Sequence, residues 1–162
     1  MGTRILSVED DERIRTAVKL ALEDEGWTVD EAGSGEEAID LFNRVLPDVV
    51  LIGTGSELQL AVEAQKLLAE KDITATVVSM PCVEWFESQP AEYRDKVLPP
   101  AVSARVAVEA AVAQSWYKLV GDTGEIVSIE HYGESADDKT LFREFGFTPE
   151  AVVAAAERSL DN

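Results

Sequence analysis

Residues 48–52 read DVVLI, and residues 53–56 continue the chain as GTGS. The four consecutive apolar side chains after Asp48 predict a strand that is buried on both faces of a parallel sheet. The glycine-rich turn leads into a helical pattern over residues 57–70, which is typical of a strand–turn–helix unit. This short stretch therefore predicts an α/β protein with a mainly parallel sheet.

The alternation of strand and helix continues on both sides of this stretch. After an apolar run at residues 4–8, apolar side chains recur at helical spacing, at Ile14, Ala17, Val18, Ala21 and Leu22. Six strands are predicted, at residues 4–8, 27–31, 48–52, 75–80, 104–110 and 125–130. One of the helices between them covers residues 34–46 and carries Ala38, Ile39, Phe42 and Leu46. The last helix is predicted to begin after Thr148, with Pro149 at its first position. We expect a three-layer α/β/α sandwich, flavodoxin-like or Rossmann-like, in which residues 1–162 form a single domain because no flexible linker interrupts the pattern.

Composition excludes several classes of function. The chain has 162 residues, 32 of them acidic and 14 basic, and its net charge of −18 would repel a phosphate backbone, so nucleic-acid binding is not expected. No apolar run approaches the roughly 20 residues that cross a bilayer, and the acidic start lacks the apolar core of a secretory signal. We therefore expect a cytoplasmic protein without membrane contact. The single cysteine, Cys82, cannot form an internal disulfide or a multi-cysteine metal site.

Residues 5–42, ILSVEDDERIRTAVKLALEDEGWTVDEAGSGEEAIDLF, together with PDVVLI at residues 47–52, resemble the receiver domain of response regulators. The resemblance implies that Glu9 and Asp10 are the acidic pair that holds Mg²⁺, and that a phosphoacceptor aspartate follows DVVLI. That position is Gly53, which has no nucleophile, so no aspartyl phosphate can form there. Without a third carboxylate, Glu9 and Asp10 are expected to form only a weak, vestigial Mg²⁺ site.

From Gly53 onward the chain resembles the C-terminal domain of transketolase. The resemblance runs through residues 53–110, WYKLVG at 116–121, IEHYGESA at 129–136 and LFREFGFTPEAVVAAA at 141–156. It implies that thiamine diphosphate, its Mg²⁺ and the acid/base residues belong to two other domains, and that this domain mainly packs in the dimer. The GDG…N metal–diphosphate motif does not occur in the sequence. No cofactor is therefore expected for this chain.

DVVLI fits both resemblances at once, as the last receiver strand and as the strand before GTGS. Because natural fusions normally join whole domains through linkers, we interpret the chain as a man-made chimera. In this interpretation a receiver-like fragment, residues 1–52, joins a transketolase-like fragment, residues 53–162, and the product has no native catalytic function and is not an enzyme. The two parents place different strands beside residues 48–52. Inserting the strand at 75–80 between the first and third strands gives the order 2-1-4-3-5-6, and strand exchange in a swapped dimer is the alternative.

Two other functions are alternatives to a chimera without activity. Gly53, Thr54, Gly55 and Ser56 lie between a strand end and a helix start, where exposed N–H groups favour an anion, so a weak phosphate-binding module is one alternative. A Ser56 side chain that caps its own helix explains the same turn equally well, and nearby carboxylates would repel a phosphate. A pseudo-receiver that binds a partner protein is the second alternative. Surfaces left uncovered by the missing transketolase domains would also favour a homodimer.

Overall fold

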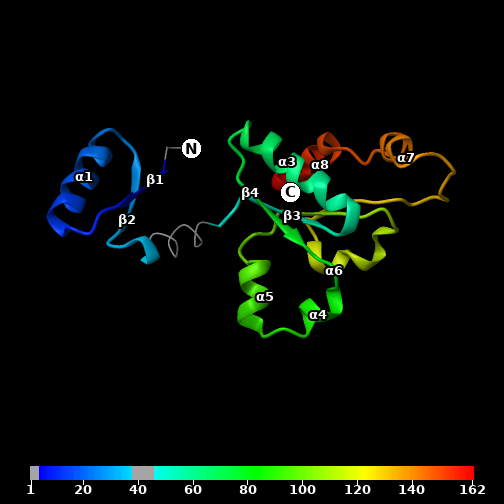
Figure 1. The fold of residues 1–162 in the computed structure, drawn as a ribbon, viewed down its shortest axis with the longest axis horizontal. Coiled ribbons are helices and arrows are strands. Elements are labelled where there is room, and N and C mark those ends of the chain that lie inside the picture. The colour runs from blue at the N-terminus through cyan, green and yellow to red at the C-terminus, as the bar shows by residue number, and fades with distance from the viewer. Residues whose placement is uncertain (1–3, 38–45) are drawn as a thin grey trace. The chain divides into compact units, whose positions relative to one another are not determined.

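The computed structural model describes residues 4–37 and 46–162 and divides the chain into two compact units, Met1–Leu46 and Pro47–Asn162 (Figure 1). In both units parallel strands are joined by helices. Three of the residues that define the helix predicted over 34–46, namely Ala38, Ile39 and Phe42, lie outside the described residues, and the fourth, Leu46, is exposed.

The described part of the first unit includes a two-stranded parallel sheet and the helix that connects its strands. Strand β1 (Arg4–Val8) pairs with β2 (Thr28–Ala32) in parallel, and α1 (Glu12–Asp24) connects them. The helix begins after Asp11, whose carboxylate accepts a hydrogen bond from the backbone N–H of Arg13 at 2.9 Å. An aspartate in this position satisfies N–H groups that have no partner within the helix, which explains where α1 starts.

Helix α1 contacts the strands through charged side chains. Lys19 Nζ lies 2.7 Å from one carboxylate oxygen of Glu31 on β2, and Arg15 Nε lies 4.0 Å from the other. Of the apolar side chains that predicted the helix, Leu22 is half-buried and the others are exposed, among them Ile14 and Val18. No residue of the helix is fully buried, so its packing on β1 and β2 is shallow and is supplemented by ion pairs.

Strand β3 (Val49–Gly53) is the centre of the second unit. It pairs in parallel with β4 (Ala75–Ser79) on one side and with β5 (Arg105–Val108) on the other, and β6 (Glu125–Val127) pairs with β5. The order of the four strands is β4-β3-β5-β6. All five residues of β3 are buried, as its continuous apolar sequence predicts.

One face of this sheet is covered by α3 (Leu58–Ala69) and α8 (Pro149–Asp161), which lie side by side in Figure 1. Val49 and Leu51 of β3 point to this face and pack against apolar side chains of both helices. Helix α8 begins after Thr148, whose hydroxyl accepts the Ala151 N–H at 3.2 Å, with a proline at the first helical position as predicted. Helix α7 (Asp138–Glu144) precedes it.

The opposite face is covered by three short helices, α4 (Val83–Glu87), α5 (Ala91–Val97) and α6 (Tyr117–Val120). Val50 and Ile52 of β3 point to this face, and the buried ring of Trp116 packs in the same apolar cluster. In Figure 1 these helices lie across the sheet from α3 and α8. The unit is thus a three-layer sandwich whose central layer is a parallel sheet.

Arg105, the first residue of β5, fastens the short helices to the sheet. Its guanidinium donates hydrogen bonds to the carbonyl oxygens of Val102 at 3.0 Å, Leu119 at 2.9 Å and Pro99 at 3.0 Å. The last carbonyls of a helix have no partner within it, and Leu119 lies in α6. Burial lowers the pKa of the Arg105 guanidinium. One cation therefore satisfies backbone oxygens of the loop after α5 and of α6 at once.

The structure confirms the α/β class, the parallel pairing and the three layers. The strands form two sheets instead of one sheet of six, although the partial orders β2-β1 and β4-β3-β5-β6 both occur in the predicted 2-1-4-3-5-6. Among the described strands β4 pairs only with β3, and Thr76 and Ser79 on it are exposed, as in an edge strand. The single domain and the swapped dimer stay predictions.

None of the described helices combines the length and the apolar character that crossing a membrane requires.

Replacing the fully buried Val50 with aspartate should unfold the second unit. An unpaired carboxylate at that site costs about 4 kcal/mol or more, a large part of the stability of a typical domain. Urea denaturation followed by tryptophan fluorescence and circular dichroism measures the loss. The control is Val62→Asp on α3, where the side chain is 39% exposed and a change within about 0.5 kcal/mol is expected. An unchanged urea midpoint for Val50→Asp would contradict the buried position of β3.

Candidate functional site

The carboxyl ends of the parallel strands meet at one edge of the second sheet, where α/β proteins commonly place their binding sites. Gly53 at the end of β3 lies opposite Val108 at the end of β5. The turn after β3 and Glu109 after β5 therefore share this edge. We call Gly53 to Glu57 together with Glu109 the carboxyl edge.

Gly53 is a glycine because its surroundings leave little room for a side chain. A Cβ atom at this position would lie 3.2 Å from Leu58 Cα and 3.4 Å from Val108 Cγ1. Its carbonyl oxygen also accepts the backbone N–H of Met80 at 2.9 Å. The interpretation of Gly53 as a receiver position that has lost its aspartate is therefore unnecessary, since close packing of β3, α3 and β5 accounts for the residue.

The turn after β3 is built from backbone geometry and not from a side-chain cap. Gly55 has a φ of +54°, in the left-handed region that favours glycine, and a short 3-10 turn, Gly55–Glu57, leads into α3. Neither Thr54 nor Glu57 makes a side-chain capping hydrogen bond at the two helix starts. The predicted Ser56 cap is not formed, because Ser56 lies inside the 3-10 turn with its side chain exposed.

Glu57 and Glu109 bring two carboxylates to the carboxyl edge. The Glu57 side chain is 6% exposed and lies at the N-terminus of α3, where a negative charge is favourable. Burial raises the pKa of the Glu109 carboxyl, and the negative charge of Glu57 raises that pKa further. The electrostatics of this edge therefore favour a proton or a cation and disfavour an anion.

The structure places the other predicted site residues separately. Glu9 and Asp10 follow β1 in the first unit, where the Glu9 carboxylate accepts the Asp11 N–H at 3.2 Å and its carbonyl oxygen accepts Arg15 Nη1 at 2.7 Å. Among the described residues, no group of three or more His, Cys, Asp and Glu side chains could hold a metal ion. The Mg²⁺ site at Glu9 and Asp10 stays a prediction.

The anion site predicted at Gly53, Thr54, Gly55 and Ser56 also stays a prediction, but Glu57 and Glu109 oppose it. Sequence reasoning noted the charge of Glu57 and missed Glu109, which it placed inside a strand at residues 104–110. The signal that could have found the pair is topological. Two adjacent parallel strands with an acidic residue just beyond each carboxyl end place those residues at the same edge.

Comparison with known proteins identifies the family. The family described as "Transketolase-like TK C-terminal domain" matches residues 41–148, more than half of the chain. The chain therefore belongs to the transketolase C-terminal domain family.

Individual relatives agree with the family match. The transketolase of Mycobacterium leprae is 73% identical over 137 residues, which are 85% of this chain and 19% of that protein. The transketolase of Mycobacterium tuberculosis strain H37Rv is 71% identical over 140 residues, again 85% of this chain and 19% of the relative. Among solved structures, transketolase from Leishmania mexicana aligns with a TM-score of 0.67 at 29% identity, covering 96% of this chain and 25% of that one. The chain spans about a fifth of the length of the curated relatives it matches.

These findings overturn the interpretation of the chain as a man-made chimera of a receiver and a transketolase fragment. The match begins at residue 41, upstream of Gly53, and relatives align with 85% of the chain, which is more than the fragment 53–162 alone. The expectation of a protein without native function that is not an enzyme is also wrong, because the relatives are named transketolases. A phosphate-binding module and a pseudo-receiver are not favoured either. The features that resembled a receiver, an acidic loop after a strand and an amphipathic helix, also occur in other α/β proteins.

Replacing Glu109 with glutamine should stabilise the chain at neutral pH. Because the pKa of Glu109 is raised in the folded state, its ionised form destabilises the fold. This destabilisation grows as the pH rises from the pKa of Glu109 in the unfolded chain through its higher pKa in the folded chain. We expect Glu109→Gln to raise the free energy of unfolding by about 0.5 kcal/mol at pH 7 and by less at pH 4. The effect is small because the side chain is only half-buried. Urea denaturation at both pH values measures it.

The matched control is Glu63→Gln, at an exposed position on α3, which should change stability at neither pH. A Glu109→Gln protein that is less stable than the parent at pH 7, or equally shifted at both pH values, would contradict the repulsion between Glu57 and Glu109.

Proposed function

We propose that this chain serves as the C-terminal domain of a transketolase and supplies a packing surface to the rest of that enzyme. The observation that carries the proposal is the high identity with mycobacterial transketolases over most of the chain. The activity proposed for the whole enzyme is ketol transfer with thiamine diphosphate. The second unit suits this role, because a sheet covered on both faces provides a rigid body with its own apolar core.

The described residues of this chain do not fit thiamine diphosphate. The turn after β3 is the place where an α/β fold would accept a phosphate, but Glu57 and Glu109 put two negative charges beside it. The described residues also offer no group of three carboxylate, histidine or cysteine ligands for a metal that would bridge the diphosphate. In this proposal the cofactor is held by parts of the enzyme that lie outside this chain.

A domain exchange tests the proposal. Residues 47–162 replace the matching C-terminal segment of the Mycobacterium leprae transketolase, and ketol transfer is measured under saturating thiamine diphosphate and Mg²⁺. The exchanged enzyme should keep kcat within about threefold of its parent, which is less than 1 kcal/mol in activation free energy. The control is the same enzyme truncated before the segment, which should lose activity or solubility. An exchanged enzyme that is folded and dimeric but inactive would contradict the proposal.

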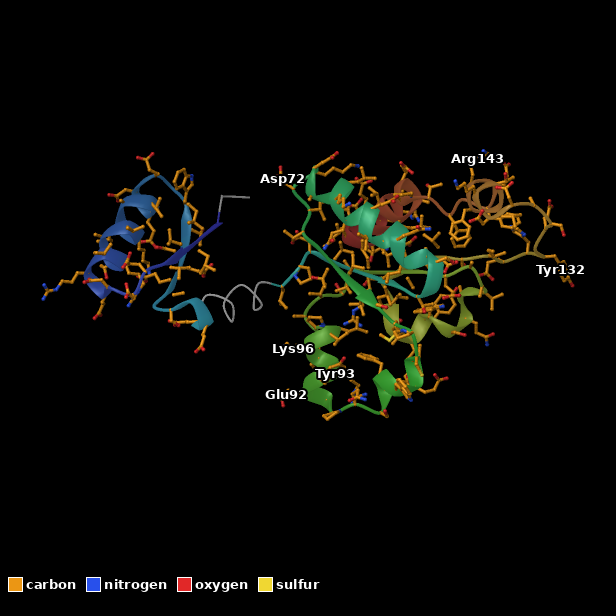
Figure 2. All side chains as sticks on the ribbon, in the orientation of Figure 1. Asp72, Glu92, Tyr93, Lys96, Tyr132 and Arg143 are labelled. Carbon is orange, nitrogen blue, oxygen red and sulfur yellow. The ribbon has the colours of Figure 1, made fainter. Side chains whose placement is uncertain are left out.

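The isolated chain is proposed to form a homodimer through apolar surface that the other domains would cover. Trp85 on α4 is 74% exposed, and Tyr132 is 97% exposed at the tip of the loop that leads to α7, where Figure 2 shows it pointing away from the sheet. Exposed aromatic residues of this kind are common anchors of protein interfaces.

Sedimentation equilibrium of the isolated chain measures this association. The net charge of −18 opposes self-association, and salt screens this repulsion. The dimer should therefore dissociate less in about 0.5 M NaCl than in about 0.05 M NaCl. Trp85→Ser should weaken the dimer, whereas Val62→Ser on α3 should not. A monomer at both salt concentrations would contradict the homodimer.

The cytoplasmic location stays a prediction.

A further inference from the structure

Glu57 is a buried carboxylate without a neutralising partner among the described residues. Of the buried side chains described, only Glu57 and Ser159 are polar. Ser159 Oγ is fully used, since it accepts the Arg105 N–H at 3.1 Å and donates to the Thr123 carbonyl oxygen at 2.8 Å. No hydrogen bond or ion pair within the described residues reaches the Glu57 carboxylate. Within the described residues no cation offsets this charge, which leaves the carboxylate available to a cation from outside.

A second carboxylate increases the need for a cation. The charge of Glu57 acts on Glu109, which is itself half-buried. Some acidic side chains elsewhere in the second unit are paired within the chain, as Glu125 is with Arg158 at 2.8 Å. The positive end of the α3 dipole offsets part of the Glu57 charge, because Glu57 lies at the N-terminus of that helix. Glu109 follows β5 and is not at this helix end. Within the described residues, no cationic side chain pairs with Glu57 or Glu109.

The carboxylate pair is accessible to a ligand. No buried side-chain oxygen or nitrogen among the described residues lacks a hydrogen-bond partner, so the oxygens of Glu57 must still reach solvent although the rest of its side chain is covered. The neighbouring Gly55 has no side chain, and a Cβ there would lie 3.6 Å from Glu57 Oε2. The Glu57 carboxylate therefore lies against the exposed backbone of the turn at Gly55.

The chemistry of the pair selects a guanidinium. A divalent metal would need more ligands than two carboxylates, and the described residues provide no third one. A guanidinium carries one positive charge and five donors in a planar fork, which suits two neighbouring carboxylates better than the point charge of an ammonium. We propose that Glu57 and Glu109 form a binding site for an arginine side chain that belongs to the part of the enzyme outside this chain. This inference rests on the proposed function.

The probe for this site is N-acetyl-arginine amide, titrated into the isolated chain and followed through backbone amide NMR shifts. Saturable shifts are expected at Gly55, Ser56, Glu57 and Glu109. Glu57→Gln and, separately, Glu109→Gln should weaken binding about three- to tenfold, and the exposed control Glu63→Gln should leave it unchanged. Amide spectra with the dispersion of the parent chain establish that each variant is folded.

Several comparison ligands decide the chemistry. N-acetyl-lysine amide should bind more weakly than the arginine probe, and free L-arginine should also bind more weakly because the glutamates repel its carboxylate. The proposal is overturned if the arginine probe produces no saturable shift, if Glu57→Gln binds it as the parent does, or if MgCl2 or free L-arginine binds more tightly. Because the titration uses the isolated chain, a failure here leaves the domain exchange and the proposed function standing.

Discussion

The second unit depends on the burial of β3 on both faces and along both edges. Val49 and Leu51 pack under α3 and α8, and Val50 and Ile52 pack under the short helices of the opposite face. The strand has β4 on one side and β5 on the other, so all five of its residues are enclosed. Burial of this kind admits only apolar side chains and a glycine at the close contact with Leu58, which is why the stretch DVVLIG is so uniform.

Much of the second unit could be predicted from the sequence, because its strands are short apolar runs and its helices carry local start and stop signals. The strand predicted at 75–80 is Ala75–Ser79, and the helix predicted after Thr148 is Pro149–Asp161. The division into two sheets could not be predicted, since a run of apolar residues does not identify its neighbour strand. Arg105 looked like an ordinary strand residue, because no local sequence signal shows that its guanidinium binds the carbonyl oxygens of Pro99, Val102 and Leu119.

The site was predicted only in part. The turn after β3 lies where the sequence predicts it, and the sequence also indicated nearby carboxylates that would repel a phosphate, but Glu109 enters only through strand pairing. The receiver interpretation failed because it rested on local features near Glu9 and Asp10 that many α/β proteins share, whereas family membership follows from an alignment over most of the chain. In the proposed function, the two carboxylates of the carboxyl edge lie on a surface that another part of the enzyme covers.

Hydrogen exchange measured by mass spectrometry tests this account most directly. The experiment compares two proteins. One is the isolated chain, and the other is the Mycobacterium leprae transketolase in which residues 47–162 replace the matching C-terminal segment. In both proteins β3 should be the best protected segment, since it is enclosed on all sides. Residues 53–57 and 109–113 should exchange more slowly in the whole enzyme, because the rest of the polypeptide covers them. Equal exchange of these segments in both proteins, or rapid exchange of β3 in the isolated chain, would contradict the account.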